Sequence, residues 1–114
     1  MADTDFEKSS LIRGRRILVI DDHRNIRISL RMALEGEGAH IFEADCVEEG
    51  TKKLGHLEKG GHGFQYDCVL LDIRMPDGSG LDVLKRLNEF DLASRVIMIS
   101  GEGTVTDAFR ATQM

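Results

Sequence analysis

The sequence of 114 residues has little of what marks secreted or membrane proteins. It contains no tryptophan, one proline and two cysteines. Its apolar runs are far shorter than the roughly 20 residues that cross a bilayer. Residues 1–10 are polar and lack the apolar stretch of a signal peptide. We therefore expect a cytoplasmic protein without a membrane span.

Basic residues are in the minority, with 15 Lys and Arg against 20 Asp and Glu and a formal net charge of −5. Such a surface gives no electrostatic reason to expect nucleic-acid binding. The basic residues Arg13, Arg15 and Arg16 directly precede a predicted strand, and we expect them to be exposed to solvent there rather than to form a phosphate-binding patch. The two cysteines, Cys46 and Cys68, are not in a CxxC motif, and the sequence is not that of a small secreted domain held together by disulfides. We therefore expect free thiols rather than a disulfide or a pair of metal ligands.

The length of the chain is sufficient for one domain. Short apolar runs alternate with amphipathic segments along it. The runs predict strands over residues 16–20, 40–44, 66–72 and 95–100. Helices are predicted over residues 25–35 and 81–90, from Asp45 and from Thr104. Strands that alternate with helices of this length form right-handed βαβ units. We therefore predict an α/β domain with a parallel sheet covered on both faces.

Local signals give finer expectations for two of these helices. Asp45 should cap the second helix, with Glu48 three residues later as its capping-box partner. Residues 75–80, MPDGSG, are dense in residues that favour turns. After this turn, the helix over residues 81–90 should direct its apolar side chains, Val83, Leu84 and Leu87, inward.

Three of the apolar runs end in an oxygen-bearing side chain. Asp21 and Asp22 follow the first run, Asp72 follows the third and Ser100 follows the fourth. In open α/β sheets the ligand chemistry lies beyond the carboxyl ends of the strands, so these groups should converge. Three close carboxylates repel one another, and Mg²⁺ prefers such oxygen ligands. We therefore predict Mg²⁺ held by Asp22 and Asp72, with Asp21 acting through water.

This arrangement would prepare Asp72 as a nucleophile towards phosphorus, with an aspartyl phosphate as the product. Ser100 would hydrogen-bond a phosphoryl oxygen, and the backbone carbonyl of Arg74 would be a further metal ligand. Two interpretations of His23 stay open. It either lines the site or is an exposed histidine at the start of a helix.

The segments LVIDD, VLLDIRMPDGSGLDVL and VIMISGEG resemble those of the receiver domain of two-component response regulators. The resemblance covers residues 15–114 and leaves 1–14 as a flexible leader. It implies a flavodoxin-like (CheY-like), doubly wound parallel sheet with the order 2-1-3-4-5. It also implies that the domain depends on Mg²⁺ and receives a phosphoryl group from a sensor histidine kinase. The phosphorylated domain would then control an output domain that acts in transcription. The tail is similar to receivers of NtrC-like transcriptional activators.

The resemblance also implies a role for individual residues. Asp72 matches the phosphoacceptor, and Asp21 and Asp22 match the acidic metal pair. Arg74 matches the residue whose carbonyl binds the metal, and Ser100 matches the switch hydroxyl. A domain of this kind is a phosphoryl acceptor and not an enzyme.

The sequence departs from the family at its C-terminal end. The family has a lysine at the end of a fifth strand, and no lysine here matches it, the last being Lys85. We expect residues 15–114 to lack the last β–α unit, so that strand 95–100 becomes an apolar sheet edge. Such an edge is a template for another chain, which predicts self-association. The alternative function is a truncated receiver that acts only as an interaction module.

A phosphatase of the haloacid-dehalogenase type also uses an aspartate at a strand end. That chemistry usually uses a second acid two residues after the nucleophile. Arg74 occupies that position after Asp72, and His23 occupies it after Asp21. The sequence therefore disfavours this class.

Overall fold

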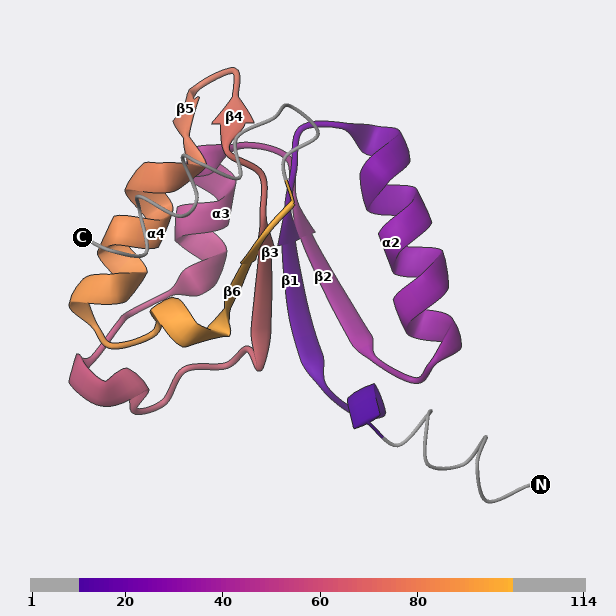
Figure 1. Ribbon diagram of the computed structural model, residues 1–114, viewed down its shortest axis with the longest axis horizontal. Helices are drawn as coiled ribbons and strands as arrows, with labels where there is room; N and C mark the ends of the chain where they lie inside the picture. Colours follow the sequence, from indigo (N-terminus) through magenta and orange to yellow (C-terminus); the bar gives the residue numbers. More distant parts are fainter. Residues whose placement is uncertain (1–10, 100–114) are drawn as a thin grey trace.

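A computed structural model describes residues 11–99, which form a four-stranded parallel sheet between helices (Figure 1). The strands are β1 (Arg16–Ile20), β2 (His40–Ala44), β3 (Cys68–Leu71) and β6 (Val96–Met98). Their order in the sheet is β2-β1-β3-β6. Because β6 is the fourth long strand along the chain, the predicted order 2-1-3-4 and the α/β class are confirmed.

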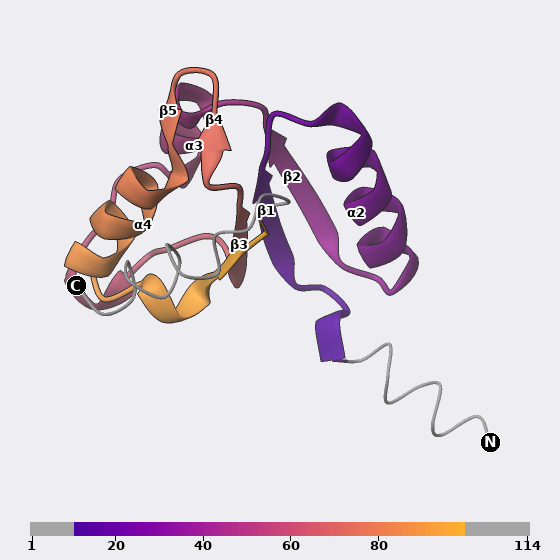
Figure 2. The same cartoon turned by 45° about the horizontal axis from the view of Figure 1, so that its top comes forward.

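Helices cover both faces of this sheet, as Figures 1 and 2 show. Helix α2 (Arg24–Gly36) lies on one face, and α3 (Val47–Leu54) and α4 (Gly80–Glu89) lie on the other. A short antiparallel hairpin of β4 (Arg74–Met75) and β5 (Gly78–Ser79) precedes α4. Two 3₁₀ helices, η1 (Lys59–Gly61) and η2 (Ala93–Arg95), lie in the connections. Among the described residues, no helix is long and apolar enough to cross a membrane.

The side chains of β1 alternate between two apolar clusters. Leu18 and Ile20 are fully buried in a cluster that also contains Leu54 of α3 and the inner residues of α4. Ile17 and Val19 point to the opposite face, where half-buried residues of α2 pack. Burial on both faces explains why β1 reads as a continuous apolar run rather than an alternating one.

The start of α3 differs from the prediction. Cys46, not Asp45, is the N-cap, and its sulfur accepts a hydrogen bond from the Glu49 backbone at 3.5 Å. The Asp77 carboxylate accepts the backbone N–H groups of the next two residues, Val47 at 2.9 Å and Glu48 at 3.0 Å. The predicted capping box is therefore wrong, because Asp77 of the hairpin β4–β5 takes these N–H groups. The hairpin lies beside the start of α3 (Figure 2).

The third strand and the turn after it also differ from the prediction, whereas the buried face of α4 agrees with it. The third strand is shorter than predicted, since only Cys68–Leu71 pair with β1, and the turn over residues 75–80 belongs to the hairpin. The inner residues of α4, Val83, Leu84 and Leu87, are buried as predicted. Ser100 and the helix expected from Thr104 lie outside the described residues, as do residues 1–10 of the predicted leader.

Candidate metal centre

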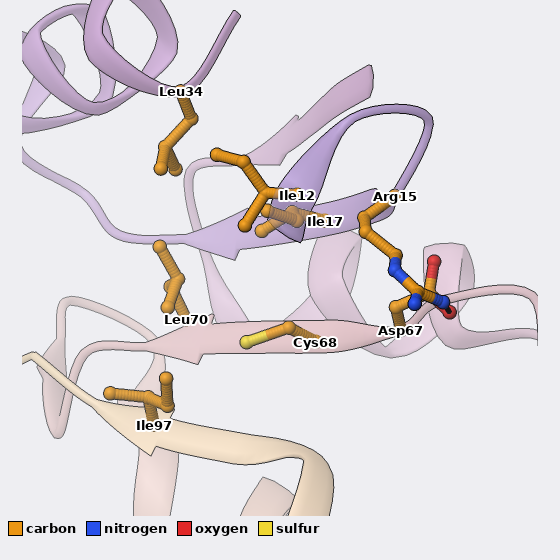
Figure 3. A pocket seen from close by; sticks show the side chains of 8 residues that line it. All are labelled: Ile12, Arg15, Ile17, Leu34, Asp67, Cys68, Leu70 and Ile97. Atoms are coloured by element: carbon orange, nitrogen blue, oxygen red, sulfur yellow. Dashed lines mark ion pairs between the residues drawn. The ribbon is translucent and has the colours of Figure 1, made fainter. Parts of the chain in front are cut away.

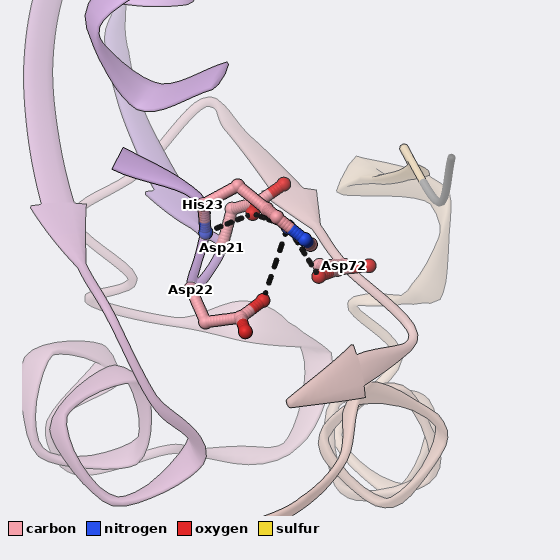
Figure 4. Close-up of side chains that lie close together, drawn as sticks. All are labelled: Asp21, Asp22, His23 and Asp72. Atoms are coloured by element: carbon pink, nitrogen blue, oxygen red, sulfur yellow. Dashed lines mark hydrogen bonds and ion pairs between the residues drawn. The ribbon is translucent and has the colours of Figure 1, made fainter. Parts of the chain in front are cut away.

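The register of the sheet brings the carboxylates together. Ile20 of β1 pairs with Leu71 of β3, so Asp21 and Asp72 leave the same edge at the same level. The backbone N–H of Asp21 donates to Ala44 at 3.0 Å and that of Asp72 donates to Ile20 at 2.8 Å, which continues the ladder by one step. Asp21 is 1% exposed and Asp72 is 3% exposed. The predicted convergence of the acidic residues is therefore present in the structure (Figure 4).

His23 lies over this cluster. Its Nδ1 is 2.9 Å from a carboxylate oxygen of Asp21, 3.2 Å from one of Asp22 and 3.7 Å from one of Asp72. The residue is also the N-cap of α2, and its side chain is 62% exposed. Both interpretations of this histidine therefore hold, because it begins the helix and its ring lines the site. Its position directly after the acidic pair is the sequence signal for that role.

Three carboxylate oxygens of the cluster accept no hydrogen bond within residues 11–99. They are one buried oxygen each of Asp21, Asp22 and Asp72. Two of these oxygens face Nδ1 of His23, at 3.2 Å for Asp22 and 3.7 Å for Asp72, but this nitrogen hydrogen-bonds Asp21. A buried charged oxygen without a hydrogen-bond partner is strongly unfavourable. One ligand atom from each of the three aspartates and one from His23 all lie within 4.8 Å of one another. This donor set fits a divalent cation, which would compensate the three negative charges.

The proton affinities reflect the same crowding. Burial raises the pKa of Asp72 from 3.8 to about 6, and the neighbouring charge of Asp21 acts in the same direction. A hydrogen bond from the backbone of Arg74 opposes this shift. The pKa of His23 is also raised, first by its hydrogen bond to Asp21 and then by the charge of Asp22. The site therefore attracts positive charge, whether as protons or as a metal ion.

Comparison with known proteins identifies the family. Residues 17–114 match the family model described as "Response regulator receiver domain". The chain belongs to this family.

Similar proteins are consistent with this assignment. The chain is 33% identical over 95 residues to a protein named cell cycle response regulator CtrA from Brucella ovis, an alignment that covers 83% of this chain and 38% of that protein. The equivalent protein of Brucella anthropi matches equally well. The chain thus spans about 38% of the length of these curated relatives.

Solved structures show the same fold. A receiver domain protein (CheY-like) from Methanospirillum hungatei JF-1 has a TM-score of 0.72 and 25% identity, and the match covers 88% of this chain and 74% of that one. The beryllofluoride-activated NtrC4 receiver domain dimer has a TM-score of 0.70 and 36% identity, with coverage of 86% and 75%.

Two residues of this receiver domain that the sequence did not single out position the acidic cluster. A Cβ at Gly80 would lie 1.9 Å from the carbonyl oxygen of Asp72, so only glycine fits there. Arg27 donates from Nη1 to the carbonyl oxygen of Asp21 at 2.7 Å, and its Nε lies 3.1 Å from Glu43 of β2. Gly80 follows Asp72 by eight residues and Arg27 follows Asp21 by six, and these spacings alone do not predict the contacts.

The remaining predicted site residues of the receiver domain have different outcomes. Arg74 begins β4 with an exposed side chain, and the role of its carbonyl as a metal ligand stays a prediction. Ser100 lies outside the described residues, so its role as the switch hydroxyl stays a prediction as well. Lys85, the last lysine of the chain, lies exposed on α4.

Proposed function

We propose that the chain accepts a phosphoryl group from a sensor histidine kinase on Asp72. One observation carries the proposal, namely that Asp72 is almost fully buried with an unpartnered oxygen beside two further carboxylates. A carboxylate oxygen of Asp72 would attack the phosphorus of a phosphohistidine. The new O–P bond forms as the N–P bond breaks, and the departing imidazole takes up a proton. Burial of Asp72 keeps bulk water away from the acyl phosphate that results.

Mg²⁺ is the cation that we propose for this reaction. Asp21, Asp22 and Asp72 would hold it, together with the carbonyl of Arg74. When bound there, it would offset the negative charge of the attacking carboxylate and of the phosphoryl oxygens. The three carboxylate oxygens without a hydrogen-bond partner support this assignment.

The domain would pass its signal to an output domain. The matched region covers 38% of a curated relative, and the remaining length of that relative leaves room for an output domain. From the resemblance of the sequence to receivers of transcriptional activators we propose an output in transcription, and from its composition a cytoplasmic location. In this scheme the chain is a phosphoryl acceptor and not an enzyme.

Beryllofluoride, which mimics an aspartyl phosphate, provides the test. Titration calorimetry of the wild type should show binding that requires Mg²⁺, and Asp72→Asn should abolish it. Asp91→Asn is the matched control, because Asp91 is exposed and has a φ of 63°, which asparagine adopts readily. A folded wild type that binds no beryllofluoride with Mg²⁺ would contradict the proposal and favour an interaction module without phosphotransfer.

A second candidate function is self-association through β6. This strand carries no charge and is the edge of the sheet within residues 11–99. Ile97 is 55% exposed on it, beside a cavity of about 430 Å³ (Figure 3). The cavity is lined by Ile12, Arg15, Ile17, Leu34, Asp67, Cys68, Leu70 and Ile97. An apolar edge of this kind pairs with the same strand of a second copy.

Sedimentation velocity tests this second candidate. The wild type should form dimers at high concentration, and Ile97→Lys should shift them to monomers because it places a charge on the edge. Asn88→Lys, at an exposed residue of α4 on the other face of the sheet, adds the same charge away from the edge and serves as the control. A wild type that stays monomeric at every concentration rules self-association out.

A further inference from the structure

We propose that His23 is a nitrogen ligand of the metal and that it raises the affinity of the site for divalent transition ions such as Co²⁺ and Ni²⁺ far more than the affinity for Mg²⁺. The proposal rests on the metal-dependent function above and concerns the ligands of the ion. An acidic triad alone supplies only oxygen ligands, which suit Mg²⁺. An imidazole ligand changes this preference, because it suits transition ions far better than Mg²⁺.

The position of the ring supports ligation. Nδ1 of His23 lies 2.9–3.7 Å from oxygens of all three aspartates, so it faces the space that the carboxylates enclose (Figure 4). Ligand atoms about 2.1–2.6 Å from one ion lie at most about 4–5 Å apart. The four candidate ligand atoms meet this condition, since all lie within 4.8 Å of one another.

The backbone holds His23 in place for this role. Its N–H donates to an oxygen of Asp21 at 2.7 Å, and its carbonyl accepts the N–H of Arg27 at 3.1 Å. Both hydrogen bonds fix the residue at the start of α2, while the side chain makes no capping hydrogen bond to the helix. The ring is therefore free to bind a metal without loss of the helix start.

The surrounding oxygens indicate that a cation belongs there. Asp21 and Asp72 are more than nine-tenths buried, and each has an oxygen in the cluster without a hydrogen-bond partner. In the metal-free site the Nδ1–H of His23 donates to Asp21, and a bound metal would replace that proton at Nδ1. The ion would then have one nitrogen and up to three carboxylate ligands.

Direct metal binding tests the proposal without any activity assay. Calorimetry on tag-free protein would compare Co²⁺ with Mg²⁺ for the wild type, His23→Gln and a control, His56→Gln. His56 is an exposed histidine 3.8 Å from Glu58 and outside the cluster. We expect His23→Gln to weaken Co²⁺ binding about tenfold or more and to change Mg²⁺ binding far less. His56→Gln should leave both affinities unchanged.

Proton NMR of the Co²⁺ complex adds a structural readout. A bound imidazole gives a hyperfine-shifted exchangeable N–H resonance, which the wild type and His56→Gln should show and His23→Gln should lack. If His23→Gln leaves the Co²⁺-to-Mg²⁺ ratio unchanged, or raises both affinities equally, His23 is not a ligand although the metal site stands. If the folded wild type binds neither ion, the proposed metal-dependent function fails together with this proposal.

Discussion

Among the individual residues, Asp72 and the carboxylates beside it have the least favourable surroundings, because their charges are close together and buried. Asp21 and Asp72 are both almost fully buried, and the ring of His23 lies beside both carboxylates. Such a cluster is costly to the fold unless a cation compensates it. The same cost would favour the binding of a cation at this site, as we propose.

Gly80 is the residue on which the shape of this cluster depends most directly. We expect Gly80→Ala to destabilise the domain by about 1–3 kcal/mol, because its Cβ would collide with the backbone carbonyl of Asp72 rather than with a flexible side chain. Beryllofluoride binding should weaken as well, since the backbone of Asp72 must move. Urea unfolding and calorimetry measure the two effects.

Gly36→Ala is the matched control for this substitution. Gly36 is the last residue of α2, and a Cβ there would meet nothing within 4 Å. Alanine favours helix over glycine, so the control should be neutral or slightly stabilising. An unfolding midpoint of Gly80→Ala equal to that of the wild type would show that the close approach to Asp72 does not constrain the fold.

At the scale of helices and strands, the sequence predicts what depends on neighbouring residues. The bounds of β1 and β2 follow from their apolar runs, and the buried face of α4 follows from the spacing of Val83, Leu84 and Leu87. The convergence of the acidic residues was also predictable, because parallel strands in register end at one edge.

Contacts that depend on how the chain folds back on itself could not be predicted in this way. Asp77 caps α3 from a hairpin 30 residues further along the chain, and its pKa is lowered by the two N–H groups that it accepts. Gly80 looks like an ordinary helix-start glycine until the fold places the Asp72 carbonyl against it. These roles arise from the packing of elements, which sequence spacing does not encode.

Across the whole molecule, the two faces of the sheet differ within the described residues. The face under α3 and α4 has thirteen buried core residues, whereas the face under α2 has five. No residue of α2 itself is buried. The apolar surface that remains on the α2 side continues to Ile97 on the sheet edge, which is why we place self-association there.

The acidic cluster also sets the stability of the whole domain. The pKa of Asp72 is about 6 in the fold and near 3.8 in the unfolded chain, so the folded state binds this proton more tightly. Without metal, this group lowers stability progressively as the pH rises from about 4 through about 6, and the loss persists above that. At about 1.4 kcal/mol per pKa unit, it amounts to roughly 2–3 kcal/mol at neutral pH.

We therefore expect Asp72→Asn, which cannot ionise, to be more stable than the wild type by roughly this amount near pH 7.5 with a chelator present. The difference should shrink towards pH 4, where the wild-type carboxyl is protonated, and Asp91→Asn should show no such trend. Added Mg²⁺ should stabilise the wild type and not Asp72→Asn, because a ligand that binds only the folded state raises its stability. Urea unfolding across this pH range, with chelator or Mg²⁺, measures all three effects. Equal stability of Asp72→Asn and the wild type at neutral pH would mean that the buried carboxylate is already compensated without a metal ion.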